Sequence, residues 1–166
     1  MTTADVVPAF LAVCPAIAPA WRDNLAFWGD EPHRGDYNDA GVIAQHLVDS
    51  YERGELAEFP AVFAVLERCF AEGDAEVQNL AAVGVVEGIQ NVASHRPFGP
   101  EVFLAWLEPA SRAAWNELCV FWGQVAEAKA AGLLGPPPGQ PAPPVVDPAD
   151  VQDPALRRIV EQVYRK

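Results

Sequence analysis

The residues best suited to chemistry in this 166-residue chain form a polar stripe of Glu87, Asn91 and His95. Because they are spaced at i, i+4 and i+8, they lie on one face of a predicted helix. Convergent donors and acceptors of this kind can bind a ligand, and a histidine can act as acid, base or metal ligand. Two other interpretations stay open: a solvent-exposed helix edge, or a structural network that fixes the turn at residues 96–99.

A second polar cluster lies in the loop from Asp30 to Asp39, which holds four acidic residues and His33. Carboxylates at this density can hold a divalent ion, but their spacing matches neither an EF-hand loop nor a zinc pattern. An acidic loop leading to a capped helix start is the commoner role. His46 falls within an apolar-faced helix and is interpreted as a packed or surface histidine rather than a ligand. The sequence therefore predicts no metal and no cofactor.

The three cysteines, Cys14, Cys69 and Cys119, form no CxxC pair and are interpreted as reduced, mostly buried thiols of a cytoplasmic protein. No nucleophile elbow, phosphate-binding loop or HExxH helix occurs. An enzyme stays open all the same, because catalytic groups need only converge in space. No signal peptide is expected, and no apolar run reaches the roughly 20 residues that span a bilayer.

The formal net charge of -12 is concentrated in residues 30–76, which hold 12 acidic side chains and three arginines. Such a surface repels phosphate backbones, which argues against a nucleic-acid partner. It can serve solubility, or it can dock a basic protein. The expected partner face consists of six acidic residues, with the stripe of Glu87, Asn91 and His95 second: Asp36, Asp39, Asp49, Glu52, Glu55 and Glu58.

Helices are expected to position these groups. Apolar spacing, caps and breakers predict helices over 5–13, 15–28, from Asn38 or Asp39 to about Arg53, and over 59–71, 74–94, 100–107 and 109–131. No segment alternates with period two for more than a few residues, and no hairpin turn of the Asn-Gly type occurs. The predicted fold class is all-α, either a helical bundle or a HEAT-like stack of helix pairs.

The pattern Pro-Ala-x-x-x-Ala-Trp-x-x-x-x-x-Phe-Trp-Gly occurs at Pro15–Gly29 and again at Pro109–Gly123. In each copy the two tryptophans are seven residues apart, on one helix face, and are expected in the core. A weaker third copy starts at Pro60, so the starts are 45 and 49 residues apart, near the length of HEAT-type repeats. The alternative is convergence, because amphipathic helices with similar ends resemble one another.

The end of the chain has a different composition. Seven of the fourteen residues in 135–148 are proline, which predicts a semi-rigid polyproline spacer. An amphipathic helix is expected over 149–166, packed on the body or on a partner. The predicted organisation is therefore a single helical domain over 1–134, a linker over 135–148 and a C-terminal helix over 149–166.

Four short segments carry a family resemblance: Tyr37-Asn-Asp-Ala-Gly, Phe59-Pro-Ala-Val-Phe, Glu76-Val-Gln-Asn-Leu and Gln90-Asn-Val-Ala-Ser-His. Over about residues 5–125 the chain resembles a family of small bacterial helical proteins of unknown function. The resemblance implies a HEAT-like fold and a relation to proposed immunity proteins of toxin systems. It implies no catalytic residues.

The leading functional hypothesis is a cytoplasmic, non-enzymatic binding protein, an immunity-type inhibitor that masks a basic protein partner. Neither a membrane nor a nucleic acid is an expected partner. One alternative is a small metal-dependent or hydrolytic enzyme that uses Glu87, Asn91 and His95. Another is a self-associating scaffold, a domain-swapped dimer in which the C-terminal helix exchanges between protomers.

Overall fold

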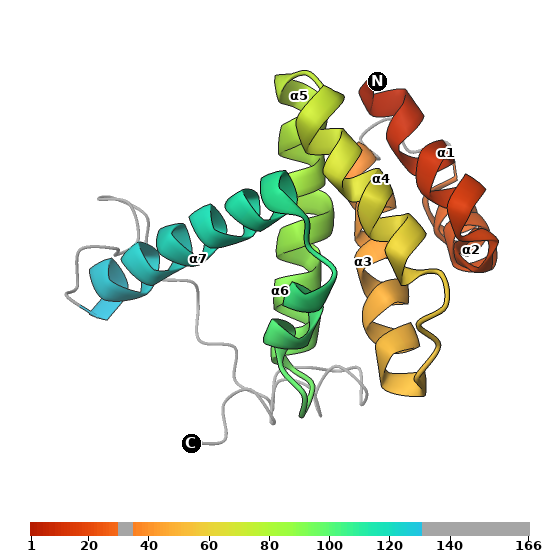
Figure 1. The fold of residues 1–166 in the computed structure, drawn as a ribbon. Helices are drawn as coiled ribbons and strands as arrows, with labels where there is room; N and C mark the ends of the chain where they lie inside the picture. The colour runs from red at the N-terminus through yellow and green to blue at the C-terminus, as the bar shows by residue number, and fades with distance from the viewer. Residues whose placement is uncertain (30–34, 131–166) are drawn as a thin grey trace, which may run out of the picture. The chain divides into compact units, whose positions relative to one another are not determined.

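The computed structural model of this chain describes residues 1–29 and 35–130, so the predicted spacer and C-terminal helix lie outside the described residues. The chain divides into two units, Met1–Gln124 and Val125–Lys166. Every regular element in the described ranges is a helix, and no strand occurs there (Figure 1). The predicted all-α class is confirmed. No single helix in these ranges has both the length and the apolar composition to span a membrane.

The first helices follow the predicted order. Helix α1 covers Thr3–Val13, a 3-10 turn (η1) covers Pro15–Ile17, and α2 covers Ala18–Trp28. The chain bends by 108° between α1 and the η1–α2 segment, and Cys14 lies at this bend. A proline cannot donate the amide hydrogen that would continue α1, which is why the break falls before Pro15.

Helix α3 covers Asp36–Arg53 and starts earlier than expected. The prediction of a cap at Asn38 or Asp39 is wrong, because Gly35 is the N-cap and its carbonyl already accepts from the Asn38 amide at 3.0 Å. The predicted end of this helix near Arg53 is confirmed, because Gly54 follows it as the C-cap with a φ of 73°, in the left-handed region. Glycine adopts this conformation without the steric cost of a Cβ atom.

Helix α4 covers Phe59–Glu72, and one continuous helical segment follows from 75 to 94. Its start is capped as predicted, since the Asp74 carboxylate accepts from the amides of Glu76 and Val77 at 3.1 and 2.9 Å. The segment is α5 (Ala75–Asn79), then a π-helical stretch, η2 (Leu80–Val86), then α6 (Glu87–Ser94). The long helix was predicted; its π-helical middle was not.

Helix α3 packs closely against this segment, as Figure 1 shows. A Cβ atom at Gly84 would lie 2.5 Å from Ala40 Cβ, and one at Gly88 would lie 2.8 Å from Ala44 Cβ. Non-bonded carbon atoms do not approach this closely, so any larger residue at Gly84 or Gly88 would push the helices apart. Glycine opposite alanine therefore allows the backbones of α3 and of the 75–94 segment to lie close together. This contact forms the centre of the core, with Ala40, Ala44 and Gly84 all buried.

The predicted helix over 100–107 is a 3-10 helix, η3 (Pro100–Ala105), which leads into α7 (Pro109–Ala130). Aromatic rings hold η3 to α3 and α4. The Tyr51 and Phe103 ring centroids are 5.3 Å apart, and those of Phe59 and Trp106 are 4.9 Å apart in an edge-to-face arrangement. Aromatic pairs at such distances stabilise beyond the area that they bury.

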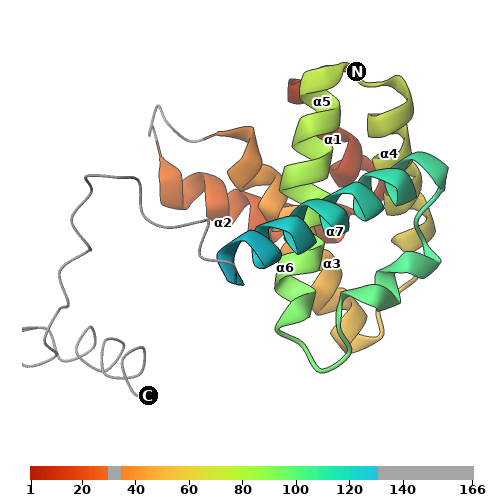
Figure 2. The ribbon, with the colours of Figure 1, turned by 90° about the vertical axis from the view of Figure 1, so that its left-hand side faces the viewer.

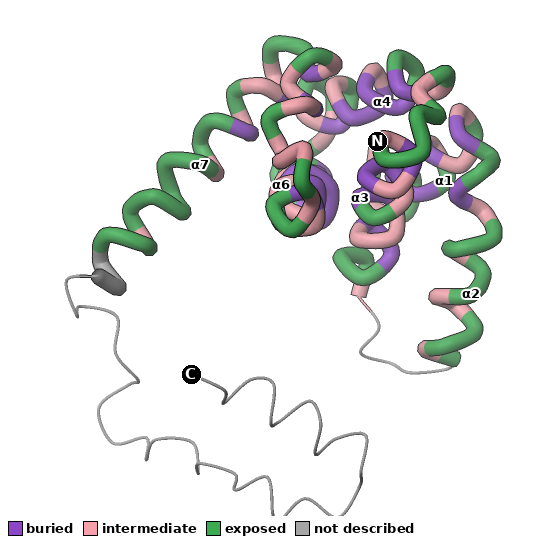
Figure 3. The backbone as a smooth tube through the Cα atoms, turned by 90° about the horizontal axis from the view of Figure 1, so that it is seen from below, coloured by how far each residue is buried: buried purple, intermediate pink, exposed green. Residues whose placement is uncertain are grey.

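Of the four tryptophans in the two copies of the repeat, only Trp115 is buried, while Trp21 and Trp28 are partly buried. Trp115 is 4% exposed and Trp21 packs against the core, but Trp122 is 45% and Phe121 53% exposed. The prediction that Trp122 belongs to the core is wrong. Towards Gln124, α7 presents mainly exposed residues, as the tube of Figure 3 shows. Its later turns therefore leave most of their side chains exposed.

A HEAT-like stack requires each repeat helix to pair with the helix that follows it, and two such pairs are in contact: α2 with α3, and α4 with α5 and η2. Figure 2 shows α7 crossing in front of the segment from α5 to α6. The partner expected for α7 is the C-terminal helix, which lies outside the described residues. The HEAT-like stack thus stays a prediction.

Candidate functional site

A hollow of about 430 Å³ lies between α6, η3 and the middle of α7. Eight described residues line it, and none of these eight carries a positive charge: Glu87, Gln90, Asn91, Pro100, Glu101, Trp115, Cys119 and Trp122. Two carboxylates therefore share the hollow with two tryptophans. This surface, called the α6–α7 groove below, combines negative charge with apolar area.

Contacts between the two helices fix the floor of the groove. The Gln90 side chain donates to the Trp115 carbonyl oxygen at 3.3 Å, and its amide nitrogen lies 3.5 Å from Cys119 Sγ. Trp115 is buried, whereas Trp122, two turns later on the same face, is exposed. The groove is thus closed at the Trp115 end and open at the Trp122 end.

The start of α7 is fixed by a carboxylate from another helix. Glu67 of α4 accepts from the Ala110 amide, the Ser111 amide and the Ser111 hydroxyl, each at 2.8 Å. Burial acts to raise the pKa of Glu67, but these hydrogen bonds outweigh it and hold the pKa below its ordinary value. Arg112 also donates to the Leu104 carbonyl. Together these contacts orient the helix that carries Trp115.

The predicted stripe is divided by the structure. Glu87 and Asn91 line the α6–α7 groove, whereas His95 is not among its lining residues. His95 is exposed and takes the C-cap position of α6, where the helix ends. Two of the three groups therefore share a surface, and the histidine that an acid–base mechanism would need lies beyond it.

The six acidic residues expected to face a partner do not form one bare surface. Asp39 is buried and accepts from the Asn24 side chain at 2.8 Å, which joins α2 to α3. Asp49 accepts from Arg96 at 3.0 Å, and Glu52 lies 3.7 Å from the same guanidinium. Much of the negative charge therefore serves internal contacts.

The other three acids make different contacts. Asp36 lies in the first turn of α3 and lines a separate hollow at the start of α5. Glu55 pairs with Arg53 at 2.8 Å. Glu58 accepts from the Cys14 thiol at 2.8 Å. Of these three acids, only Glu58 contacts a residue that can bind a metal ion or act as a nucleophile.

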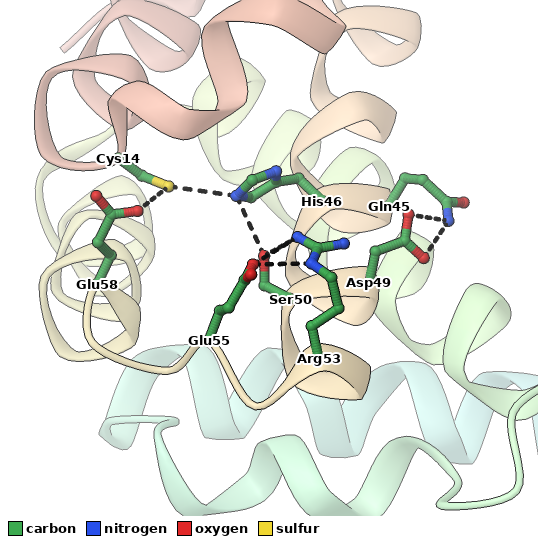
Figure 4. A network of polar contacts seen from close by, with 8 residues as sticks. All are labelled: Cys14, Gln45, His46, Asp49, Ser50, Arg53, Glu55 and Glu58. Atoms are coloured by element: carbon green, nitrogen blue, oxygen red, sulfur yellow. Dashed lines mark hydrogen bonds and ion pairs between the residues drawn. The ribbon is translucent and has the colours of Figure 1, made fainter.

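Cys14, His46 and Glu58 form a cluster at the bend between α1 and η1 (Figure 4). His46 Nε2 lies 3.5 Å from Cys14 Sγ and 3.3 Å from Ser50 Oγ. Arg53 donates to the same Ser50 hydroxyl at 3.2 Å. Because Arg53 donates to Ser50 and the thiol donates to Glu58, this pattern favours a neutral imidazole whose Nε2 accepts from the serine.

Burial governs the protonation of this cluster. Burial, with the hydrogen bond to Glu58, raises the pKa of the Cys14 thiol to about 12. Burial and the nearby charge of Arg53 lower the pKa of His46. The thiol therefore keeps its proton at neutral pH, and no ion pair between thiolate and imidazolium forms. These groups are not poised as a cysteine nucleophile; they are three potential metal ligands.

Sequence reasoning missed this cluster. Cys14 lies 32 residues from His46 and 44 residues from Glu58, so no motif spacing connects them. His46 was interpreted as a packed or surface histidine, and Glu58 as one of the acids facing a partner. The helix boundaries before Pro15 and before α4 were both predicted, but the proximity of these two places depends on how α1, α3 and α4 pack.

A family model described as a domain of unknown function (DUF7674) matches residues 7–123. The chain belongs to this family. The predicted membership of a family of unknown function is thus confirmed, over nearly the predicted range. The match includes both the α6–α7 groove and the Cys14 cluster. No curated protein and no solved structure matches the chain.

Proposed function

We propose that this protein is a non-enzymatic binding module whose α6–α7 groove takes a basic, amphipathic segment of a protein partner. The observation that carries the proposal is the lining of the groove, in which Glu87 and Glu101 accompany Trp115 and Trp122 without any cationic residue. Carboxylates attract lysine and arginine, while indole faces bind both their charge and the apolar side chains beside them.

The exposure of Trp122 supports a macromolecular partner. This side chain lines the groove and is 45% exposed. Tryptophan is enriched among the residues that dominate binding energy at protein interfaces. A net charge of -12 adds long-range attraction for a basic protein, which speeds association and makes it salt-dependent.

The proposed partner face differs from the one predicted from the sequence. The sequence placed the six acids of residues 36–58 first and Glu87 and Asn91 second, whereas the proposed face includes Glu87 and Asn91 and not those six acids. An immunity-type inhibitor in a bacterial host is the specific form that we propose. A cytoplasmic location belongs to the same proposal, because the free thiols of Cys14, Cys69 and Cys119 suit a reducing compartment.

Calorimetric titration with two designed helical peptides tests the proposal. The peptides carry the same leucine face and differ only in having lysine or glutamate on the polar face. We expect binding of the lysine peptide and none of the glutamate peptide. At a partly exposed site each charge pair contributes about 0.2–1 kcal/mol, so E87Q combined with E101Q should weaken binding roughly 2–30-fold.

The matched control is Glu117→Gln, which makes the same charge change on the opposite surface of α7, where Glu117 lines a different hollow. It should leave the affinity within about twofold at moderate salt, since screening removes its distant effect. Equal binding of both peptides, or an equal effect of E117Q and of the groove substitutions, would contradict the proposal.

A further inference from the structure

The Cys14 cluster has a role that the proposed binding function does not use. Its three side chains come from three parts of the chain: the bend after α1, the middle of α3 and the turn before α4. Their ligand atoms, Cys14 Sγ, His46 Nε2 and a Glu58 carboxylate oxygen, all lie within 4.8 Å of one another. We infer that these three residues form a binding site for a divalent metal ion of the zinc class.

The donor set matches the metal. Thiolate sulfur, imidazole nitrogen and carboxylate oxygen are the three ligand types that zinc takes from proteins, and a site with three protein ligands leaves a fourth position for water or a small ligand. One thiolate and one carboxylate supply two negative charges, which balance the dication in a partly buried place. Hard cations such as Mg²⁺ prefer oxygen ligands and are disfavoured by the cysteine.

The distances also agree with a tetrahedral ion. Bond lengths of about 2.3 Å to sulfur and about 2.0 Å to nitrogen place those two atoms about 3.5 Å apart. The observed separation of Cys14 Sγ and His46 Nε2 is 3.5 Å. The 2.8 Å between Sγ and Glu58 is that of a hydrogen bond, and it must open when the ion replaces the shared proton. Glu58 is partly exposed and precedes α4, so its side chain has room to turn.

The neighbours of the cluster favour the ligand form of His46. A metal-binding imidazole must be neutral and must offer a lone pair. Figure 4 shows Nε2 turned toward Cys14 and Ser50. Its one lone pair accepts from the Ser50 hydroxyl, and this hydrogen bond must open when the ion binds. Binding releases the thiol proton to solvent and forms a sulfur–metal bond, with no change of oxidation state.

Titration of the full, chelator-treated chain with Co²⁺ tests the site. We expect one equivalent to bind, with the near-ultraviolet charge-transfer absorption of a cobalt–thiolate bond, and Zn²⁺ to displace it. C14S should abolish this absorption. Because Cys14 is buried, Glu58→Gln provides a second variant at a partly exposed position, and it should weaken Co²⁺ binding at least tenfold while the absorption persists at saturation.

Cys119→Ser is the control, because Cys119 is an exposed thiol outside the cluster. It should leave both the absorption and the affinity unchanged. Three results would overturn the inference: no thiolate absorption in the unaltered chain, absorption that persists in folded C14S, or affinity in E58Q equal to that of the unaltered chain. Each of these outcomes is independent of peptide binding at the α6–α7 groove.

Discussion

Glu67 provides the sharpest test of how this fold holds its groove. Its carboxylate accepts three hydrogen bonds of 2.8 Å from the first turn of α7. It therefore acts as an N-cap supplied by a different helix, and its charge also faces the positive end of the helix dipole. Removing the side chain would leave two backbone amides without an acceptor next to Ser111, which is fully buried.

The expected cost follows from these contacts. A hydrogen bond to a charged group contributes about 1.5–3 kcal/mol, but three bonds to one partly buried carboxylate are not additive. We expect E67A to lower the free energy of unfolding by about 2–4 kcal/mol. Glu67→Gln keeps one accepting oxygen and loses the charge, so its cost should be about half as large.

The pH dependence gives a second readout. The folded pKa of Glu67 lies below its ordinary value of 4.5, so the contact stabilises fully above that pH. As the pH falls below 4.5, the unfolded chain takes up the proton first and the stabilisation decreases. The stability difference between the unaltered chain and E67Q should therefore shrink as the pH falls below 4.5.

Urea unfolding followed by tryptophan fluorescence measures both effects. Glu72→Ala is the control, because Glu72 lies on the same helix and makes only an exposed ion pair with Arg68 at 3.3 Å. It should cost less than about 0.5 kcal/mol. If E67A costs no more than E72A, or if the difference between the unaltered chain and E67Q does not change with pH, the capping role assigned to Glu67 is incorrect.

Four further substitutions test the packing and the cap of α5, each by the same urea unfolding measurement. Gly84→Val should destabilise by about 1–3 kcal/mol or more, because its Cβ would meet Ala40 Cβ at 2.5 Å; Gly41→Ala, with open space around it, should stabilise by about 0.5–1 kcal/mol. Asp74→Ala should cost about 1 kcal/mol by removing the cap of α5. Phe59→Ala should cost about 3–5 kcal/mol, because the ring is 2% exposed within the aromatic cluster.

Local signals predicted most of the helix ends. Asp74 caps a helix start and Gly54 ends a helix, and both effects are local. A cap accepts from amides two or three residues away, and a left-handed glycine needs no distant partner. The start of α3 was misplaced because Gly35 carries no side chain that marks it as a cap. The π-helical stretch was missed because only its packing against α3 reveals it.

The repeat shows where a pattern ceases to predict burial. Trp115 and Trp122 share one helix face, and an isolated helix gives no reason to distinguish them. The first is buried, whereas the second lines the α6–α7 groove and is 45% exposed. Whether a side chain is buried depends on the element packed against it as well as on its own type. The same helix face therefore led to a correct prediction for Trp115 and a wrong one for Trp122.

The sequence by itself determined the helical class, nearly all helix positions and the family, because hydrophobic period and caps act within a few residues. Only the tertiary structure decided which polar groups meet. It paired Asp49 with Arg96, separated His95 from Glu87 and Asn91, and brought Cys14 to His46. Contacts between distant segments depend on how the helices pack. Here glycines opposite alanines determine how closely two helix backbones approach, and the spacing of residues within one helix does not predict this.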